Sequence, residues 1–353
     1  MIQRNRTRQI KCGEIFIGGT KPISVQSMTN TDTRNVETTV NQIKELQTAG
    51  CEIVRVAVPD MEAAQAIGQI KNQINIPLVA DIHFDYRLAI EAMKQGVDKL
   101  RINPGNIGDE ERVKEVVEMA KLKRIPIRIG VNGGSLDKEI LQKYDGVTAE
   151  GLVESAMKHV HILEKYEFED IVISIKASDV QLTYEAYEML ASQVDYPLHI
   201  GVTEAGTPWK GTIKSAMGIG AMLLTGIGDT LRVSLTGNPV EEVRVGREIL
   251  NGLGIRRFSI EIISCPTCGR CNVHLENVVL KLEEALENVE SNLKVAVMGC
   301  AVNGPGEAKG ADLGVACGKG EALLFRKGEI VKKIKEEEIV ETLLHEIKIM
   351  DHT

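Results

Sequence analysis

Cysteine spacing is the strongest chemical signal in this chain of 353 residues, which contains seven cysteines. Cys265, Cys268 and Cys271 form a C-x₂-C-x₂-C run, and Cys300 follows within a glycine-rich segment, residues 297–307. Two thiolates at this spacing can hold one metal ion or one cluster. Zinc would need a second pair of cysteines or histidines, and Cys300 has none close in sequence. The pattern therefore favours an iron–sulfur cluster with three thiolates and a different fourth ligand, although the spacing alone also allows Cys271.

A second signal is a set of basic residues near the ends of short β-branched runs. Because a charge inside a strand is costly unless it is paired, such residues call for an anion or a carboxylate. The bidentate fork of arginine favours phosphate or diphosphate. The simpler alternative is that each cation pairs with a carboxylate on a neighbouring helix. The set consists of Arg55, Arg101, Arg128, Lys176 and Arg232.

Two further side chains at the ends of such runs are candidates for proton transfer. Glu204 directly follows the run at residues 197–203, and a carboxylate in a cationic, partly dry pocket is a candidate proton donor or acceptor. His83 follows Asp81 at the end of another run, where a histidine is more often a structural hydrogen-bonding group. We therefore favour Glu204 as the acid.

Eight β-branched runs that alternate with amphipathic stretches must position these residues. Residues 36–49, for example, repeat apolar side chains at helical spacing before Gly50. Eight strand–helix units in about 250 residues predict an α/β fold with a (β/α)₈ barrel over residues 1–253, with an open doubly wound sheet as the alternative. The predicted strands are 23–27, 53–58, 76–83, 99–103, 126–131, 170–176, 197–203 and 229–235.

The remaining residues, 254–353, follow a different pattern that predicts a small α+β domain. Two helices are expected, over residues 275–293 and in the last segment of the chain. Four strands are expected, at 259–263, 294–298, 322–325 and 329–331, the last two as a hairpin. This domain carries the cysteine run, so we expect it to be the iron–sulfur domain.

Composition excludes several classes of protein. The net charge of −8 argues against a nucleic-acid or anionic-membrane surface over the whole molecule. No apolar stretch approaches the roughly 18 residues that span a bilayer, and the first ten residues lack a signal peptide. An odd number of cysteines in a long chain indicates reduced thiols, so we read Cys12, Cys51 and Cys317 as buried thiols and expect a cytoplasmic protein.

Two segments in the smaller domain carry a resemblance to a known family. Residues 264–270, Ser-Cys-Pro-Thr-Cys-Gly-Arg, and residues 298–308, Met-Gly-Cys-Ala-Val-Asn-Gly-Pro-Gly-Glu-Ala, closely resemble the 4-hydroxy-3-methylbut-2-en-1-yl diphosphate synthases. Barrel segments 25–29, 80–84, 101–105 and 201–206 are also similar to that family. The resemblance covers essentially the whole chain, in the two-domain bacterial form of the family.

The resemblance implies an oxidoreductase of the methylerythritol phosphate pathway of isoprenoid biosynthesis. Its reaction would be the reductive ring opening and dehydroxylation of 2-C-methyl-D-erythritol 2,4-cyclodiphosphate to 4-hydroxy-3-methylbut-2-enyl diphosphate. One [4Fe-4S] cluster per chain would be held by Cys265, Cys268, Cys300 and Glu307. Flavodoxin or ferredoxin would supply electrons, and a head-to-tail homodimer would complete each site.

For this substrate we hypothesise the following roles for the barrel residues. Glu204 would be the catalytic acid. The cyclic diphosphate would be held by Arg55, His83, Arg101, Arg128, Asn132, Lys176, Arg232 and Ser234.

Three other classes are weaker interpretations. A barrel enzyme acting on pterins or corrinoids would need aromatic side chains, and only Phe84, Tyr86 and Trp209 stand near turns. A zinc-stabilised binding module would be colourless and would have no use for the basic residues. A radical enzyme using S-adenosylmethionine usually carries a C-x₃-C-x₂-C motif beside its first strand, whereas these cysteines follow the barrel.

Overall fold

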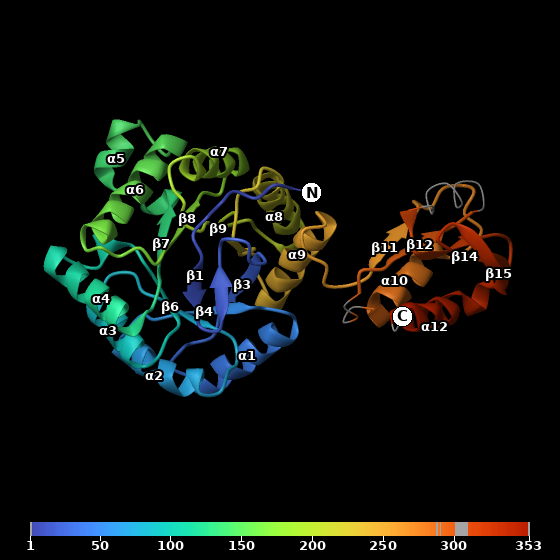
Figure 1. Cartoon of the computed structure of the whole chain (residues 1–353), viewed down its shortest axis with the longest axis horizontal. Helices are drawn as coiled ribbons and strands as arrows, with labels where there is room; N and C mark the ends of the chain where they lie inside the picture. The colour runs from blue at the N-terminus through green and yellow to red at the C-terminus, as the bar shows by residue number, and fades with distance from the viewer. Residues whose placement is uncertain (1, 287–288, 290, 301–309, 352–353) are drawn as a thin grey trace. The chain divides into compact units, whose positions relative to one another are not determined.

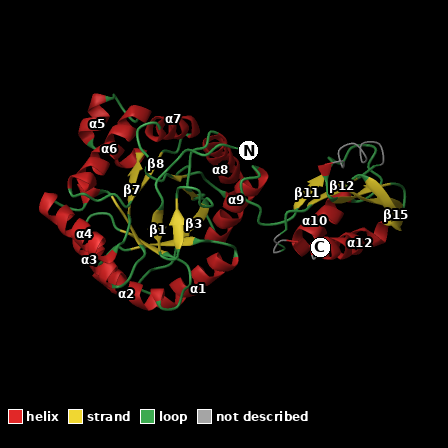
Figure 2. Cartoon of the chain, in the orientation of Figure 1, coloured by secondary structure: helices red, strands yellow, loops and turns green. Residues whose placement is uncertain are grey.

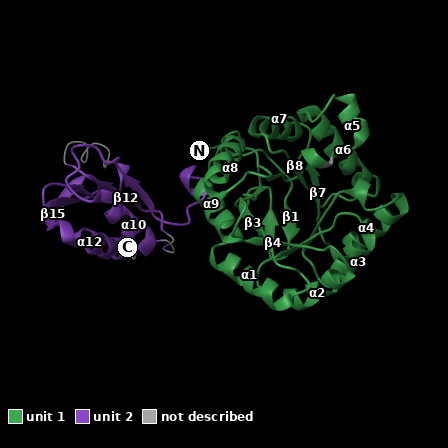
Figure 3. Ribbon diagram, turned by 180° about the vertical axis from the view of Figure 1, so that it is seen from behind, with its two compact units in different colours: residues 1–249 green, residues 250–353 purple. Residues whose placement is uncertain are grey.

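The computed structural model describes residues 2–286, 289, 291–300 and 310–351. It divides into two compact units, residues 1–249 and 250–353 (Figure 3). The domain boundary that the sequence suggests, between residues 253 and 254, stays a prediction. Within the described ranges, no helix has both the length and the apolar character needed to cross a membrane.

The first unit is a parallel eight-stranded barrel, as the sequence predicts. The strands follow the order β8-β7-β6-β5-β4-β3-β10-β9. A parallel bridge between Ile173 and Leu198 closes the ring from β8 to the start of β9, which excludes the open sheet. The strands are β3 (Ser24–Met28), β4 (Ile53–Ala57), β5 (Leu78–Asp81), β6 (Lys99–Ile102), β7 (Ile127–Asn132), β8 (Ile171–Lys176), β9 (His199–Ile200) and β10 (Thr230–Leu231).

Helices surround these strands (Figures 1 and 2). Helix α1 shows why: the Asn35 side chain caps its first turn, and Val40, Ile43 and Leu46 are buried on one face. Gly50 follows it with φ +94°, a conformation that favours glycine. The helices are α1 (Val36–Thr48), α2 (Met61–Lys71), α3 (Tyr86–Lys94), α4 (Glu110–Lys123), α5 (Lys138–Lys143), α6 (Ala149–Lys165), α7 (Val180–Ala191), α8 (Pro208–Leu224) and α9 (Pro239–Gly252), with short 3₁₀ helices η1 (Pro104–Asn106) and η2 (Gly133–Ser135).

A hairpin that the sequence analysis missed precedes the barrel. Its strands β1 (Ile10–Cys12) and β2 (Ile15–Ile17) pair antiparallel. Cys12 and Ile17 are fully buried against Ile53 and Val79, which lie at or near the beginnings of β4 and β5. The hairpin therefore covers the amino-terminal end of the barrel, opposite the end where active sites of this fold lie.

The second unit is the expected α+β domain, with one correction: it has five described strands instead of four. The missed strand is β13, whose residues Leu-Gly-Val-Ala-Cys include a glycine and show no alternation, because both faces are buried. Strands β11, β12 and β13 are parallel, and β13, β14 and β15 are antiparallel. The elements are β11 (Glu261–Ser264), α10 (Leu275–Leu286), β12 (Lys294–Met298), β13 (Leu313–Cys317), β14 (Glu321–Arg326), β15 (Glu329–Lys335), the 3₁₀ helix η4 (Glu336–Glu338) and α12 (Ile339–Asp351).

Helices α10 and α12 pack together on one face of this sheet. Leu282 and Leu343 are fully buried there against Val297 and Val315. The parallel arrangement of β11, β12 and β13 brings their carboxyl ends to one edge, where the cysteines begin.

Candidate active site

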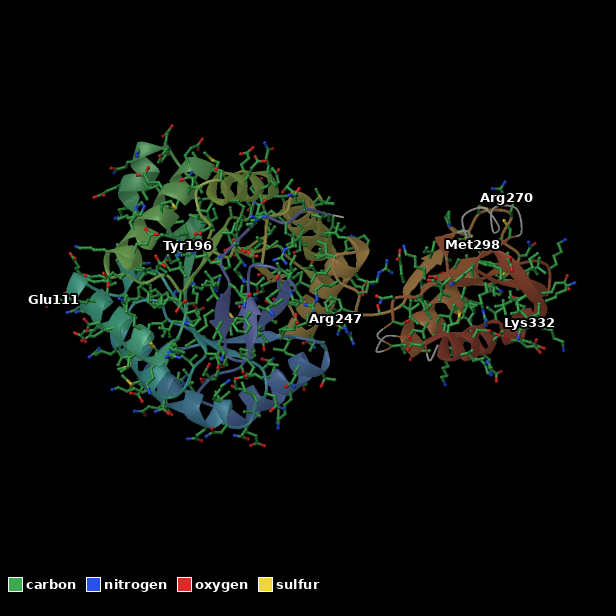
Figure 4. All side chains as sticks on the ribbon, in the orientation of Figure 1. Glu111, Tyr196, Arg247, Arg270, Met298 and Lys332 are labelled. Carbon is green, nitrogen blue, oxygen red and sulfur yellow. The ribbon has the colours of Figure 1, made fainter. Side chains whose placement is uncertain are left out.

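The basic residues predicted from the sequence come together inside the barrel, where side chains fill the space within the ring of strands (Figure 4). Arg101 on β6 is paired in register with Arg128 on the neighbouring strand β7, and Lys176 on β8 is paired with Asn132 on β7. Arg55 on β4 is opposite Met28 on β3. Neighbouring strands thus direct cations toward a common interior, as the carboxyl ends of parallel barrel strands do.

Asp81 at the end of β5 is the acidic centre of this group. Arg101 Nη1 donates to Asp81 Oδ1 at 3.1 Å, and Arg55 Nε lies 3.6 Å from Asp81 Oδ2. His83 Nε2 approaches the same oxygen at 3.5 Å. Burial alone would raise the pKa of the Asp81 carboxyl, but Arg55, His83 and Arg101 together lower it. Asp81 therefore stays ionised and holds two arginines in place.

Glu242 on α9 is a second carboxylate, and the sequence analysis did not assign it a role. Its two oxygens accept from Nε and Nη2 of Arg232, both at 3.2 Å. They also accept from Ser27 Oγ at 3.0 Å and from the Leu235 amide at 3.1 Å. The simpler alternative from the sequence analysis, in which a cation pairs with a carboxylate on a neighbouring helix, is therefore correct for Arg232. The pair orients the guanidinium and leaves one of its terminal nitrogens, Nη1, near Met28 Sδ at 3.8 Å.

Arg128 and Lys176 are buried without a carboxylate partner among the described residues. Arg128 is 1% exposed and donates from Nη1 to Ser174 Oγ at 2.8 Å, while its Nε and Nη2 have no hydrogen-bond partner. Burial, followed by the repulsion of Arg55 and Arg101, lowers the pKa of Arg128. Burial and the charge of Arg128 likewise lower the pKa of Lys176. Buried cations without a carboxylate partner are stabilised most by an anion that carries several charges.

Two glycines make room for these cations. A Cβ on Gly130 would lie 2.3 Å from Nε of Arg101, and one on Gly201 would lie 2.9 Å from Nζ of Lys176. Gly130 also accepts a hydrogen bond from Arg101 Nη2 at 3.0 Å through its carbonyl oxygen. The strands thus place a glycine beside each of these two large basic side chains, Arg101 and Lys176, where any other residue would meet the cation.

The remaining predicted barrel residues lie at the edge of this group. Glu204 follows β9 and is exposed, with φ +51°, a left-handed conformation that costs a non-glycine residue about 1 kcal/mol. His83 is exposed, and Asn132 and Ser234 are half-buried. Glu204 is thus a strained, exposed carboxylate in the loop that follows β9, and not the partly dry carboxylate that the sequence analysis expects.

The cysteines form a second group, in the smaller unit. Cys265 directly follows β11 and accepts from the Gly299 amide at 3.2 Å, while Cys300 is buried just after β12. Cys268 is exposed in the loop after Cys265, and hydrogen bonds from the backbone and side chain of Arg270 lower the pKa of its thiol. These thiol donors suit an iron–sulfur cluster in chemistry, and Cys265 and Cys300 follow the neighbouring parallel strands β11 and β12.

Further observations concern the choice of cluster ligands and the remaining cysteines. Within the described ranges, no three His, Cys, Asp or Glu side chains are arranged to hold a metal ion. Glu307, the predicted fourth ligand, lies outside the described residues. Cys271 packs against Gly299, where a Cβ would lie 2.5 Å from its sulfur. Cys317, Cys12 and Cys51 are buried free thiols, as predicted.

Fold and site together define a (β/α)₈ barrel protein with several buried cations in its interior and a cysteine-bearing α+β domain. The family model described as the GcpE TIM-barrel domain matches residues 7–247, and that described as the GcpE protein C-terminal domain matches residues 261–349. The chain belongs to the GcpE family, which confirms the family resemblance of the sequence.

Curated relatives match over nearly their whole length and are named 4-hydroxy-3-methylbut-2-en-1-yl diphosphate synthase (flavodoxin). The relative from Ruminiclostridium cellulolyticum is 62% identical over 349 residues, covering 99% of both chains. That from Clostridium perfringens is 61% identical, covering 97% of this chain and 98% of the relative. That from Geobacter sulfurreducens is 58% identical, covering 97% of each.

Solved structures support the barrel alone. Dihydropteroate synthase from Stenotrophomonas maltophilia aligns with a TM-score of 0.50 at 12% identity, covering 70% of this chain and 98% of that one. The 3-dehydroquinate dehydratase from Geobacillus kaustophilus aligns with a TM-score of 0.50 at 16% identity and the same coverage. At such identity the likeness concerns the fold and not the pterin chemistry of the first protein.

Proposed function

We propose that this protein converts 2-C-methyl-D-erythritol 2,4-cyclodiphosphate to 4-hydroxy-3-methylbut-2-enyl diphosphate, a step of isoprenoid precursor biosynthesis. In this reaction the ring C–O bond to phosphate breaks and one hydroxyl leaves as water, with two electrons and two protons consumed. The observation that carries the proposal is the identity of about 60% over the full length to relatives that bear the name of this synthase. The cationic barrel interior supports it independently, because a cyclic diphosphate is a compact, multiply charged anion.

The barrel residues would bind and orient the diphosphate. Arg128 and Lys176 have no carboxylate partner within the described part of the chain. They would form the strongest contacts, because a bound anion would offset the cost of burying their positive charges. Arg55 and Arg101 would keep their ion pairs with Asp81 and present their remaining N–H groups. The rest of the set would complete the contacts: His83, Asn132, Arg232 and Ser234.

Glu204 would give a proton to the hydroxyl as it leaves. Its exposed position in the loop after β9 allows the carboxyl to take up a proton from solvent between turnovers. Glu204→Gln keeps the size of the side chain and removes the acid, so it should lose turnover while binding substrate normally.

The smaller domain would hold one [4Fe-4S] cluster through Cys265, Cys268, Cys300 and Glu307. The cluster, when bound, supplies electrons one at a time to the substrate. Cys271 lies close enough to this edge to compete for the role of Glu307. A Cys271→Ser protein that keeps its cluster, together with a Glu307→Ala protein that loses turnover, would support the carboxylate ligand. The reverse pair of results would refute it.

Flavodoxin is the expected electron donor, since the relatives carry that word in their names, and ferredoxin is the alternative. We also propose a head-to-tail homodimer in the cytoplasm, in which the barrel of one chain works with the cysteine domain of its partner. Mixing a Glu204→Gln chain with a Cys300→Ala chain should restore one working site per mixed dimer. Absence of any recovery would contradict shared sites.

The first experiment measures iron, acid-labile sulfide and zinc per chain in protein purified without oxygen, followed by turnover of the cyclic diphosphate with reduced flavodoxin. Near four irons and four sulfides per chain, with formation of the linear diphosphate, would support the proposal. Zinc alone in a colourless protein would refute the reductive chemistry.

A further inference from the structure

Below the cations of the candidate active site, the barrel contains a deeper polar layer whose residues have no role in the proposed function. Lys99 begins β6, two residues before Arg101, and so faces the same interior nearer the amino-terminal end. Thr230 precedes Arg232 by two residues in the same way and is directly opposite His199 on β9. The layer therefore lies directly beneath the predicted diphosphate site.

The polar atoms of this layer are buried and unpaired. Lys99, Thr230 and His199 are each 0% exposed, and Gln26 is 1% exposed. Lys99 Nζ, Thr230 Oγ1, both ring nitrogens of His199 and both amide atoms of Gln26 lack a hydrogen-bond partner. An unpaired buried polar group costs about 1–3 kcal/mol, so several in one layer indicate a bound species.

The charge of Lys99 has no counter-ion among the described residues around it. Asp98, the next residue, pairs with Lys71 and accepts from the Leu78 amide. Asp229, next to Thr230, pairs with Arg4.

The other acidic groups near Lys99 do not act as its counter-ion. Asp81 and Glu242 bind the arginines of the layer above. Cys12, from the hairpin below, is fully buried, and burial raises the pKa of its thiol, so it stays neutral. Arg128 and Arg55 add further positive charge near Lys99. A group of cations and neutral donors without a carboxylate is a site for an anion rather than for a cation.

The occupant must be small. The β1–β2 hairpin covers the layer from below, with Cys12 and Ile17 packed on Ile53 and Val79. The cations that suit a diphosphate lie above it. One ammonium group with hydroxyl, amide and imidazole N–H donors matches a monovalent anion without directional lone pairs, which accepts from donors of mixed geometry.

We propose that the base of the barrel binds one chloride ion between Lys99 Nζ, Thr230 Oγ1, Gln26 Nε2 and an N–H of His199. The ion balances the charge of Lys99 and satisfies the donors beneath the diphosphate site. It thereby leaves the upper cations free for the substrate. The proposal does not depend on the identity of the substrate or on the cluster, because it concerns the protein before substrate binds.

Thermal unfolding of the full-length, anaerobically purified protein tests the proposal, with sodium chloride compared with sodium gluconate at equal ionic strength. Chloride at about a hundred times its Kd should raise Tm by ~5 °C relative to gluconate. Lys99→Met, which replaces the ammonium by an apolar end, should abolish this difference, and Thr230→Val should reduce it. Lys123→Met is the matched control, because Lys123 is exposed on α4.

A crystal soaked in sodium bromide provides the direct readout. An anomalous peak within about 3.5 Å of Lys99 Nζ, absent in Lys99→Met, would support the site. Water alone at the base of the barrel, or an equal chloride effect in the Lys99→Met protein, would overturn it. Neither result would bear on turnover of the cyclic diphosphate, so the two proposals fail separately.

Discussion

Asp81 offers the sharpest test of how the cationic interior is stabilised. Asp81→Asn keeps the shape of the side chain but removes the charge that faces Arg101 at 3.1 Å and Arg55 at 3.6 Å. All three side chains are at most 14% exposed, so water cannot replace the carboxylate. Loss of one partner from a buried ion pair costs about 3–5 kcal/mol. In a domain of this size the variant should lower Tm by about 10 °C.

Calorimetry without pyrophosphate measures the loss of Tm in Asp81→Asn. Calorimetry with pyrophosphate tests whether uncompensated positive charge causes that loss. Pyrophosphate should raise Tm more in Asp81→Asn than in the unchanged protein, since the variant has one more uncompensated positive charge to offer. Asp85→Asn is the control: Asp85 pairs with exposed Arg87, and asparagine caps α3 as well as aspartate does. An equal loss of stability in both variants would contradict this role of Asp81. So would a pyrophosphate effect on Asp81→Asn no larger than that on the unchanged protein.

Three further predictions concern single groups. Glu204→Gln should lower kcat at least ~100-fold with little change in KM, measured anaerobically with reduced flavodoxin; normal kcat would exclude the acid role. Gly130→Ala should raise KM, because a Cβ would lie 2.3 Å from Arg101 Nε, whereas Gly134→Ala, with open space around it, should not; equal KM values would show that Arg101 adapts. In chloride-free buffer the free energy of unfolding should rise by up to ~3 kcal/mol between pH 8 and 10, because burial lowers the pKa of folded Lys99 from 10.5 to about 8 while the unfolded chain keeps its proton. Urea unfolding at each pH measures this rise, which Lys99→Met should lack.

The sequence predicted the barrel well because each of its strands is buried on both faces and so reads as a β-branched run. It missed the β1–β2 hairpin and β13, since three residues, or five that include a glycine, carry too little periodicity. Closure of the ring also rests on the pairing of β10 with β3, where Thr230 pairs with Ser24, and residues so far apart in sequence give no local signal.

The site was predictable in its cations and not in their partners. A basic residue inside a β-branched run is conspicuous, so all five were found from local pattern. Glu242 lies in the first turn of α9, where a carboxylate is ordinary, and nothing local shows that it reaches Arg232. Asp81 was noticed as the end of a strand, but its ion pairs depend on the register of β5 with β4 and β6. The roles of these residues toward the substrate stay predictions.

The arrangement of charges indicates how the barrel balances stability against binding. Asp81 and Glu242 neutralise only part of the interior charge. Asp81 orients Arg55 and Arg101, Glu242 orients Arg232, and Arg128 and Lys176 have no carboxylate partner among the described residues. More carboxylates would stabilise the substrate-free protein, but they would compete with the diphosphate for the same N–H groups. We expect the uncompensated cations to lower the stability of the free protein and to strengthen binding of the proposed diphosphate. This view requires that any variant placing a carboxylate beside Arg128, such as Ser174→Asp, raise Tm and weaken diphosphate binding together.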